Sequence, residues 1–135
     1  MPVNEPMLLS QRIVQVCLFL VAAIAIFGGT LQMYLGQPET TPRLDNVHRF
    51  MGGIYLMSGV TGLWVATTIQ RHDTLIFLLA VTVLVGGIGR LISIAKVGLP
   101  EPSAVWLGYL IPELVIPFII IAAQIVTHNA KRAAI

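Results

Sequence analysis

Residues 75–97, LIFLLAVTVLVGGIGRLISIAKV, form an apolar run interrupted by charge only at Arg90 and Lys96. A helix of about 20 residues crosses about 30 Å of hydrocarbon, so this run is long enough to span a membrane. Arg90 lies well inside it, and an ionisable side chain costs roughly 3 kcal/mol there on insertion scales. The run therefore predicts a transmembrane helix that carries one candidate for a functional site.

Three further apolar runs, at residues 13–35, 50–70 and 104–127, have similar length and character. Hydrophobic residues make up 56% of the 135 residues and charged residues only 10%, whereas soluble domains carry about 25% charged residues. We therefore predict an all-α polytopic membrane protein, a single domain over residues 1–135 built as an antiparallel four-helix transmembrane bundle. Residues 37–49 are predicted to be the main loop outside the membrane.

The basic residues of the connections predict the orientation of the chain. Four of them fall on the side of the termini and three on the opposite side: Arg12, Arg71, Lys131 and Arg132 against Arg43, Arg49 and Lys96. Cytoplasmic loops carry the excess of Lys and Arg in membrane proteins. Both termini are therefore expected in the cytoplasm, and the loop at 37–49 is expected outside.

Glu113, in the run 104–127, is a second charge within a predicted span and has the opposite sign to Arg90. At about 1.5 Å per residue from the short connection between the two spans, Arg90 and Glu113 lie roughly 12 and 15 Å below the same membrane face. An ion pair is the least costly way to hold both charges at this depth. We expect Arg90 and Glu113 to form such a pair.

Proline and glycine positions predict how these helices are shaped and packed. Pro112 and Pro117 flank Glu113, where each removes a backbone donor and is expected to kink the helix. Small residues let helix backbones approach closely in membranes. The glycines expected at such helix contacts are Gly52, Gly59, Gly62, Gly86 and Gly87.

Several of these segments resemble one bacterial membrane family, known as domain of unknown function 4345. The resemblance covers residues 12–125 and is carried by His48-Arg49-Phe50-Met51-Gly52-Gly53, by Gly86-Gly87-Ile88-Gly89-Arg90-Leu91-Ile92-Ser93 with Gly98-Leu99-Pro100, and by Pro112-Glu113-Leu114 with Pro117. It implies a compact four-helix protein of the bacterial inner membrane and four positions of interest, Arg49, Arg90, Ser93 and Glu113. It implies no assigned reaction.

Polar residues near the predicted outer face indicate a site for lipid. Arg49 and Arg90, with His48 and Ser93, could hold the headgroup of an anionic phospholipid while glycine-lined grooves accept its acyl chains. Apart from such a phospholipid, no cofactor is expected. An equally weighted interpretation is that Arg90 and Glu113 only fix the packing of two helices.

An alternative function is translocation of protons or of a small ion or solute, with Glu113 and Arg90 in the pathway. Four helices leave little room for such a pathway, so it would have to form between subunits. The glycine-rich spans also predict self-association, which we expect to give a homo-oligomer, with a trimer as the guessed stoichiometry, and association with other membrane proteins.

Catalytic and nucleic-acid-binding functions are not indicated. His48 and Asp45 could share a metal ion, but Arg49 stands beside them and further ligands are not expected nearby. Motifs for redox, phosphate or haem chemistry do not occur, and no basic run with interleaved aromatic residues suggests nucleic acid. We therefore predict a protein that is not an enzyme, holds no metal, and supports envelope integrity or membrane energetics.

Overall fold

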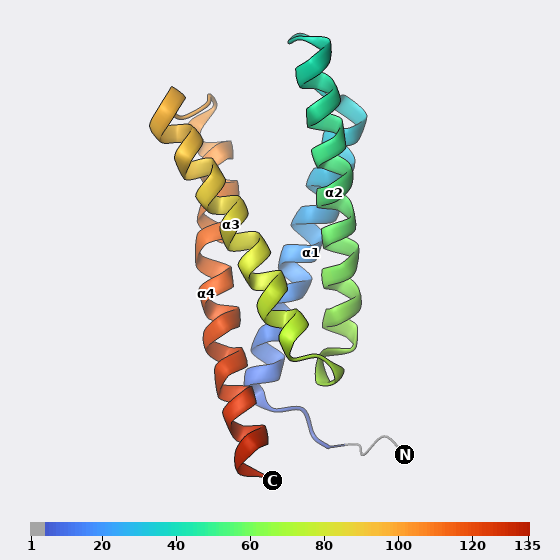
Figure 1. The fold of residues 1–135 in the computed structure, drawn as a ribbon, viewed down its shortest axis with the longest axis vertical. Helices are drawn as coiled ribbons and strands as arrows, with labels where there is room; N and C mark the ends of the chain where they lie inside the picture. Colours follow the sequence, from blue (N-terminus) through green and yellow to red (C-terminus); the bar gives the residue numbers. More distant parts are fainter. Residues whose placement is uncertain (1–4) are drawn as a thin grey trace. The chain divides into compact units, whose positions relative to one another are not determined.

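The computed structural model describes residues 5–135 and contains four long helices (Figure 1). They are α1 (Leu9–Leu35), α2 (Pro42–Thr67), α3 (Thr74–Val97) and α4 (Ser103–Ala133), and a short 3₁₀ helix, η1 (Ile69–Arg71), separates α2 from α3. No strand occurs within residues 5–135. All four helices are long and apolar enough to cross a membrane. The predicted all-α class is confirmed, and the chain is a multi-pass membrane protein.

The second helix begins at Pro42, whereas the sequence predicts a span from residue 50 after a loop at 37–49. Thr41 caps this helix, because its hydroxyl accepts a hydrogen bond from the Leu44 N–H at 3.3 Å. Pro42 suits the first helical turn, and Asp45 in that turn complements the positive end of the helix dipole. Hydropathy alone missed these polar first turns.

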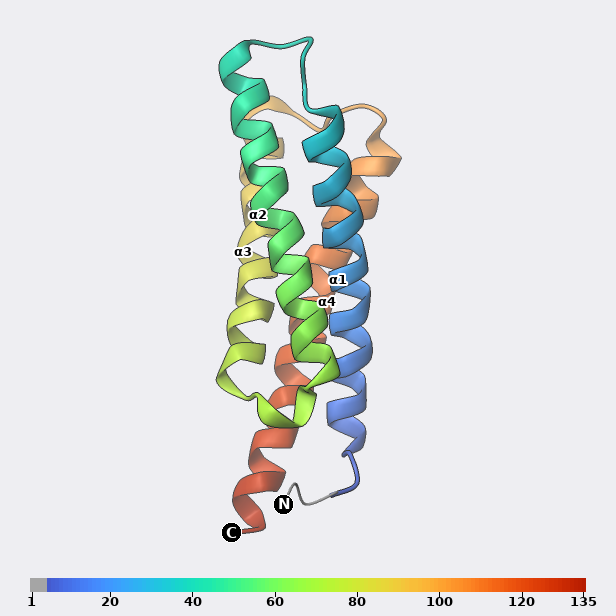
Figure 2. The ribbon, with the colours of Figure 1, turned by 90° about the vertical axis from the view of Figure 1, so that its right-hand side faces the viewer.

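Contacts between residues divide the chain into two compact units. The first unit comprises residues 18–69, and the second comprises residues 70–135 together with the residues up to 17. The first unit holds most of α1 and all of α2, which run antiparallel to each other (Figure 2). The second unit holds the first turns of α1 with α3 and α4, and α3 and α4 are likewise antiparallel partners.

Two glycines of α2 lie at close contacts with α1 in the first unit. A Cβ added at Gly59 would lie 2.8 Å from the backbone nitrogen of Ile26, and one at Gly52 would lie 3.0 Å from the carbonyl oxygen of Gly29. The space beside Gly62 is less restricted, since its added Cβ would make only a 3.8 Å contact with Ala22. Gly52 and Gly59 therefore allow the two backbones to approach each other.

Only one glycine of the predicted pair on α3 lies at a close contact. A Cβ added at Gly87 would lie 2.9 Å from Leu114 and 3.4 Å from the Glu113 side chain on α4. An added Cβ at Gly86 would meet nothing within 4 Å. Gly86 therefore lacks the close approach that we predicted, because it points about 100° away from Gly87 around the helix.

We expect Gly59→Ala to destabilise the protein by about 1–3 kcal/mol, because the added methyl must displace α1 backbone atoms rather than a flexible side chain. Gly86→Ala is the matched control and should be neutral or slightly stabilising, since alanine favours helix by about 1 kcal/mol over glycine. Thermal unfolding in one detergent checks both variants. Equal melting temperatures for Gly59→Ala and wild type would show that the close contact is unimportant.

Candidate functional site

Arg90 on α3 and Glu113 on α4 form the predicted ion pair. The Arg90 Nε donates a hydrogen bond to the Glu113 Oε2 at 2.6 Å. The Glu113 side chain is 11% exposed and that of Arg90 33% exposed, so the carboxylate is the deeper partner. The close approach at Gly87 brings α3 against α4 beside Glu113. The pair therefore joins the two long helices of the second unit.

Two aromatic rings of α4 lie beside the guanidinium. The Arg90 Cζ is 5.9 Å from the ring centroid of Trp106 and 5.6 Å from that of Tyr109. Cations at this distance from an aromatic face are attracted by its quadrupole. Tyr109 and Glu113 are one helical turn apart on α4, so a single face of this helix supplies both the carboxylate and the aromatic contact. The rings partly replace the water that Arg90 loses in the membrane.

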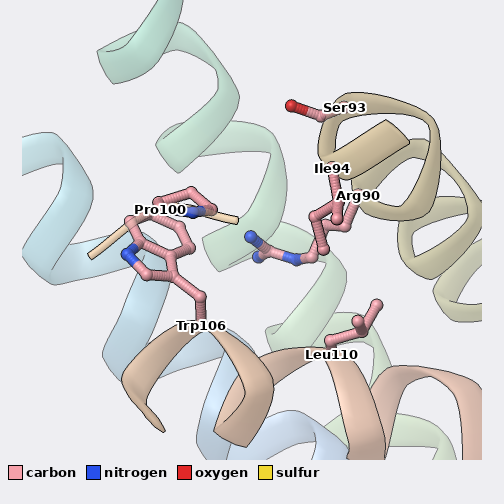
Figure 3. A pocket seen from close by; sticks show the side chains of 6 residues that line it. All are labelled: Arg90, Ser93, Ile94, Pro100, Trp106 and Leu110. Atoms are coloured by element: carbon pink, nitrogen blue, oxygen red, sulfur yellow. The ribbon is translucent and has the colours of Figure 1, made fainter. Parts of the chain in front are cut away.

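A pocket of about 80 Å³ opens at the tip of Arg90 (Figure 3). Its lining comes from α3, α4 and their connection: Arg90, Ser93, Ile94, Pro100, Trp106 and Leu110. Figure 3 shows the terminal guanidinium nitrogens directed toward Pro100 and Trp106. Among residues 5–135 the hydrogen bond of Arg90 is made by Nε, and its two Nη atoms have no partner there. Four N–H donors therefore face a pocket with a largely apolar lining.

Arg49, which we predicted to bind a headgroup, instead holds the end of α1 in the first unit. Its Nη1 donates to the carbonyls of Met33 and Tyr34 at 2.7 and 3.0 Å, and its Nη2 donates to that of Leu35 at 3.4 Å. Its Nε donates to Asp45 at 2.9 Å. These carbonyls have no partner within their own helix, and a cation there also complements the helix dipole. Arg49 therefore caps α1.

His48 and Gly36 belong to the same turn as Arg49. The His48 carbonyl accepts a hydrogen bond from the Gln32 side chain at 2.9 Å, which ties the start of α2 to α1. Gly36 follows α1 with φ +58°, and a side chain there would collide with Asp45 and Arg49. Of the four residues predicted to bind lipid, the structure brings Arg90 and Ser93 to one pocket and places Arg49 and His48 in this turn.

The prolines of α4 lie within an uninterrupted helix. Pro112 and Pro117 flank Glu113, and the helix runs from Ser103 to Ala133 through both. Each proline leaves one carbonyl of the preceding turn without its backbone donor. The predicted kink stays a prediction.

A second polar cluster, which sequence reasoning missed, lies at the other end of α3 and α4. Gln124 Nε2 donates to Asp73 Oδ1 at 2.5 Å, and His128 Nδ1 lies 2.7 Å from Asp73 Oδ2. Ser10 and Thr127 share a 2.7 Å hydrogen bond between their hydroxyls. A signal existed in the sequence, because residues 124, 127 and 128 follow helical spacing and residue 73 is predicted on the same side of the membrane.

Asp73 is held in its ionised form by its neighbours. Burial alone would raise the pKa of Asp73, but hydrogen bonds with His128 and Gln124, and the charges of His128 and Lys131, together lower it. Groups of three or more metal-ligating side chains do not occur within residues 5–135. The cluster is thus built around a single carboxylate.

Comparison with protein families adds one finding. The family model described as domain of unknown function (DUF4345) matches residues 12–124. This match includes Arg90, Glu113 and the residues that line the pocket, whereas His128 lies beyond it. No curated protein and no solved structure matches the chain.

We expect Glu113→Leu to lower the free energy of unfolding by about 2–3 kcal/mol, less than for a fully buried pair because a third of Arg90 is exposed. The double variant Arg90→Met/Glu113→Leu should recover at least half of this loss, since it removes both charges. Unfolding of wild type, Glu113→Leu, Arg90→Met and the double variant in detergent gives the coupling energy. Strictly additive losses would contradict a coupled pair.

The second polar cluster, which we call the Asp73 cluster, predicts that the stability of the protein falls in acid. Because folding lowers the pKa of Asp73 below its ordinary value of 3.8, its contribution to stability is present above about pH 4 and is lost as pH falls through the folded-state value. Asp73→Asn should therefore show a smaller fall in melting temperature than wild type between about pH 5 and pH 3. If the melting temperatures of the two proteins fell equally with pH, ionised Asp73 would not contribute to stability in this way.

Proposed function

The chain belongs to the family described as domain of unknown function (DUF4345), and we propose that it is a non-catalytic membrane protein whose Arg90 pocket binds the headgroup of an anionic phospholipid. This proposal rests on how the three nitrogens of the Arg90 guanidinium are used. Its Nε is fixed by Glu113, while its two Nη atoms face the pocket without a partner among residues 5–135. A guanidinium edge of this kind matches the oxygens of a phosphate group.

The depth of Arg90 supports a ligand from the lipid headgroup region. Arg90 precedes the end of α3 at Val97 by about two turns, which is roughly 10 Å along the helix axis. An arginine side chain at this depth reaches toward the interface while its methylenes stay in hydrocarbon. In this proposal its terminal nitrogens reach the level of the lipid phosphate groups.

The surfaces around the pocket suit the rest of a lipid. The pocket of about 80 Å³ is small, so it takes the phosphate portion and leaves the acyl chains outside. Ile88, Leu91 and Ile92 on α3 are exposed and apolar, so the same helix offers these chains an apolar surface on its side away from Arg90. The Ser93 hydroxyl at the pocket adds a donor or acceptor for a headgroup oxygen.

Glu113 prepares the site for its ligand. A guanidinium without a partner would change its rotamer to reach water, whereas the 2.6 Å contact with Glu113 fixes its plane. Trp106 and Tyr109 hold the cation from α4. Pre-positioned donors lose less entropy when a ligand binds. The structural and lipid-binding interpretations of the pair are therefore compatible.

The wider role that we propose is support of envelope integrity or membrane energetics in a bacterial inner membrane. In this proposal both termini lie in the cytoplasm and the Arg90 pocket serves the outer leaflet. The protein acts as a homo-oligomer, with a trimer as the working stoichiometry, and it associates with other membrane proteins. Loss of the gene should disturb the membrane barrier or potential rather than remove a metabolic conversion.

Translocation of protons or of a small ion or solute stays the alternative prediction. Glu113 and the polar residue Gln124 both lie on the buried face of α4, but Pro117 and Ile120 lie between them and are also buried. This apolar stretch favours a binding role for Arg90 and Glu113. Proton flux into proteoliposomes that is lost in Glu113→Gln would instead support translocation.

Native mass spectrometry of the gently extracted protein tests lipid binding. We expect wild type to retain an added anionic phospholipid about tenfold more than Arg90→Gln, a difference of 1.4 kcal/mol that one charge-assisted contact can supply. Lys96→Gln is the matched control, because it removes an exposed cation from the last turn of α3 but outside the pocket. Equal retention by wild type and Arg90→Gln would refute the proposal.

A further inference from the structure

The Asp73 cluster contains Gln124, Asp73 and His128, whose side chains contact one another in that order. Gln124 on α4 donates to Asp73, which precedes α3, and Asp73 in turn contacts His128 one turn further along α4. Gln124 is 1% exposed, whereas the side chain of His128 is 44% exposed. The chain of contacts thus begins at a buried amide and ends at an imidazole that reaches the surface of the second unit.

The orientation of the Gln124 amide is determined by Asp73. Its Nε2 faces the carboxylate, and its Oε1 is buried without a hydrogen-bond partner among residues 5–135. The reverse orientation would place two oxygens against each other, so the carboxylate decides which end of the amide faces it. Buried polar atoms rarely go without a partner. This exception shows that the hydrogen bond to Asp73 dominates the local arrangement.

The contact with Asp73 also determines where the proton of neutral His128 lies. The pKa of Asp73 is lowered, so the carboxylate is ionised at neutral pH and can only accept hydrogen bonds. The 2.7 Å contact between His128 Nδ1 and Asp73 Oδ2 therefore requires a proton on Nδ1. Because a neutral imidazole carries one N–H, its Nε2 keeps a free electron pair.

We propose that His128 is a proton-acceptor site, with Asp73 and Gln124 as its positioning residues. A proton from solvent binds the electron pair of Nε2, the Nδ1–H stays on Asp73, and the product is an imidazolium paired with a carboxylate. A carboxylate that fixes the tautomer and ring of a histidine is the arrangement by which proteins prepare an imidazole for proton transfer. This site is independent of the Arg90 pocket and does not rest on lipid binding.

The remaining charged and titratable groups near this end of the second unit are mostly basic. Lys131 lies close enough to influence Asp73, and Gln70 of the same connection donates to the Glu5 carbonyl. The groups on the adjoining segments are Glu5, Arg12, Arg71, His72, Lys131 and Arg132. Asp73 is the carboxylate in contact with His128, so its removal is the direct test of the assignment.

Nitrogen-15 NMR of the full-length protein labelled at histidine, in phospholipid nanodiscs, tests the proposal. His128→Gln identifies the resonances of His128, and His48 in the first unit serves as an internal reference. We expect neutral His128 to carry its proton on Nδ1 with an excess of about tenfold over Nε2.

Two variants show whether Asp73 and Gln124 position the imidazole. Asp73→Asn, which keeps the size of the side chain, should abolish the tenfold preference for the Nδ1 proton, and Gln124→Met should reduce it. Thermal unfolding of each variant reports whether it is folded. A wild-type His128 with its proton on Nε2, or an unchanged tautomer ratio in folded Asp73→Asn, would overturn the assignment.

Discussion

The contact between Arg90 and Glu113 is the interaction on which the second unit depends. Hydrocarbon does not tolerate an isolated charge, so each of these side chains needs the other. Gly87 lies at this contact, because a Cβ added there would lie 2.9 Å from the end of the Leu114 side chain and 3.4 Å from Glu113. The contact between α3 and α4 therefore combines the small residue Gly87, the carboxylate of Glu113 and the 2.6 Å hydrogen bond from Arg90.

Arg49 and Arg90 show that the number of free N–H donors, and not the residue type alone, decides whether an arginine can bind a ligand. Arg49 distributes its donors over three carbonyls at the end of α1 and the carboxylate of Asp45. Arg90 uses Nε alone within the part of the chain that the structure describes, and its other donors face a pocket. Arg49 therefore stabilises a turn, whereas Arg90 has N–H donors left for a ligand. Composition and depth could not separate these roles.

Much of the fold and part of the site could be predicted from the sequence. The apolar runs identified all four helices because hydrophobic length is a direct physical requirement of a membrane span. The pairing of Arg90 with Glu113 followed from their depths relative to a short connection. The start of α2 at Pro42 could not be predicted, since capping by Thr41 extends the helix into polar sequence that hydropathy assigns to a loop.

Other features depend on geometry that spacing does not contain. Gly86 and Gly87 are adjacent in sequence, yet only Gly87 faces α4, because the rotation of a helix about its axis is set by packing. Likewise, the contacts of Asp73 with Gln124 and His128 need the last turns of α4 to lie against the residues that precede α3. The helical spacing of residues 124, 127 and 128 and their side of the membrane were the signals that the sequence held, and they do not specify which side chain contacts Asp73.

In the function that we propose, the free donors of Arg90 contact a lipid phosphate. Solid-state NMR can measure dipolar coupling between guanidinium nitrogen-15 and lipid phosphorus-31 directly in a bilayer. We expect the Arg90 nitrogens, assigned by the loss of their resonances in Arg90→Gln, to show a strong coupling in wild type that persists in Lys96→Gln. No coupling at the Arg90 resonances of wild type would exclude a lipid phosphate at this site.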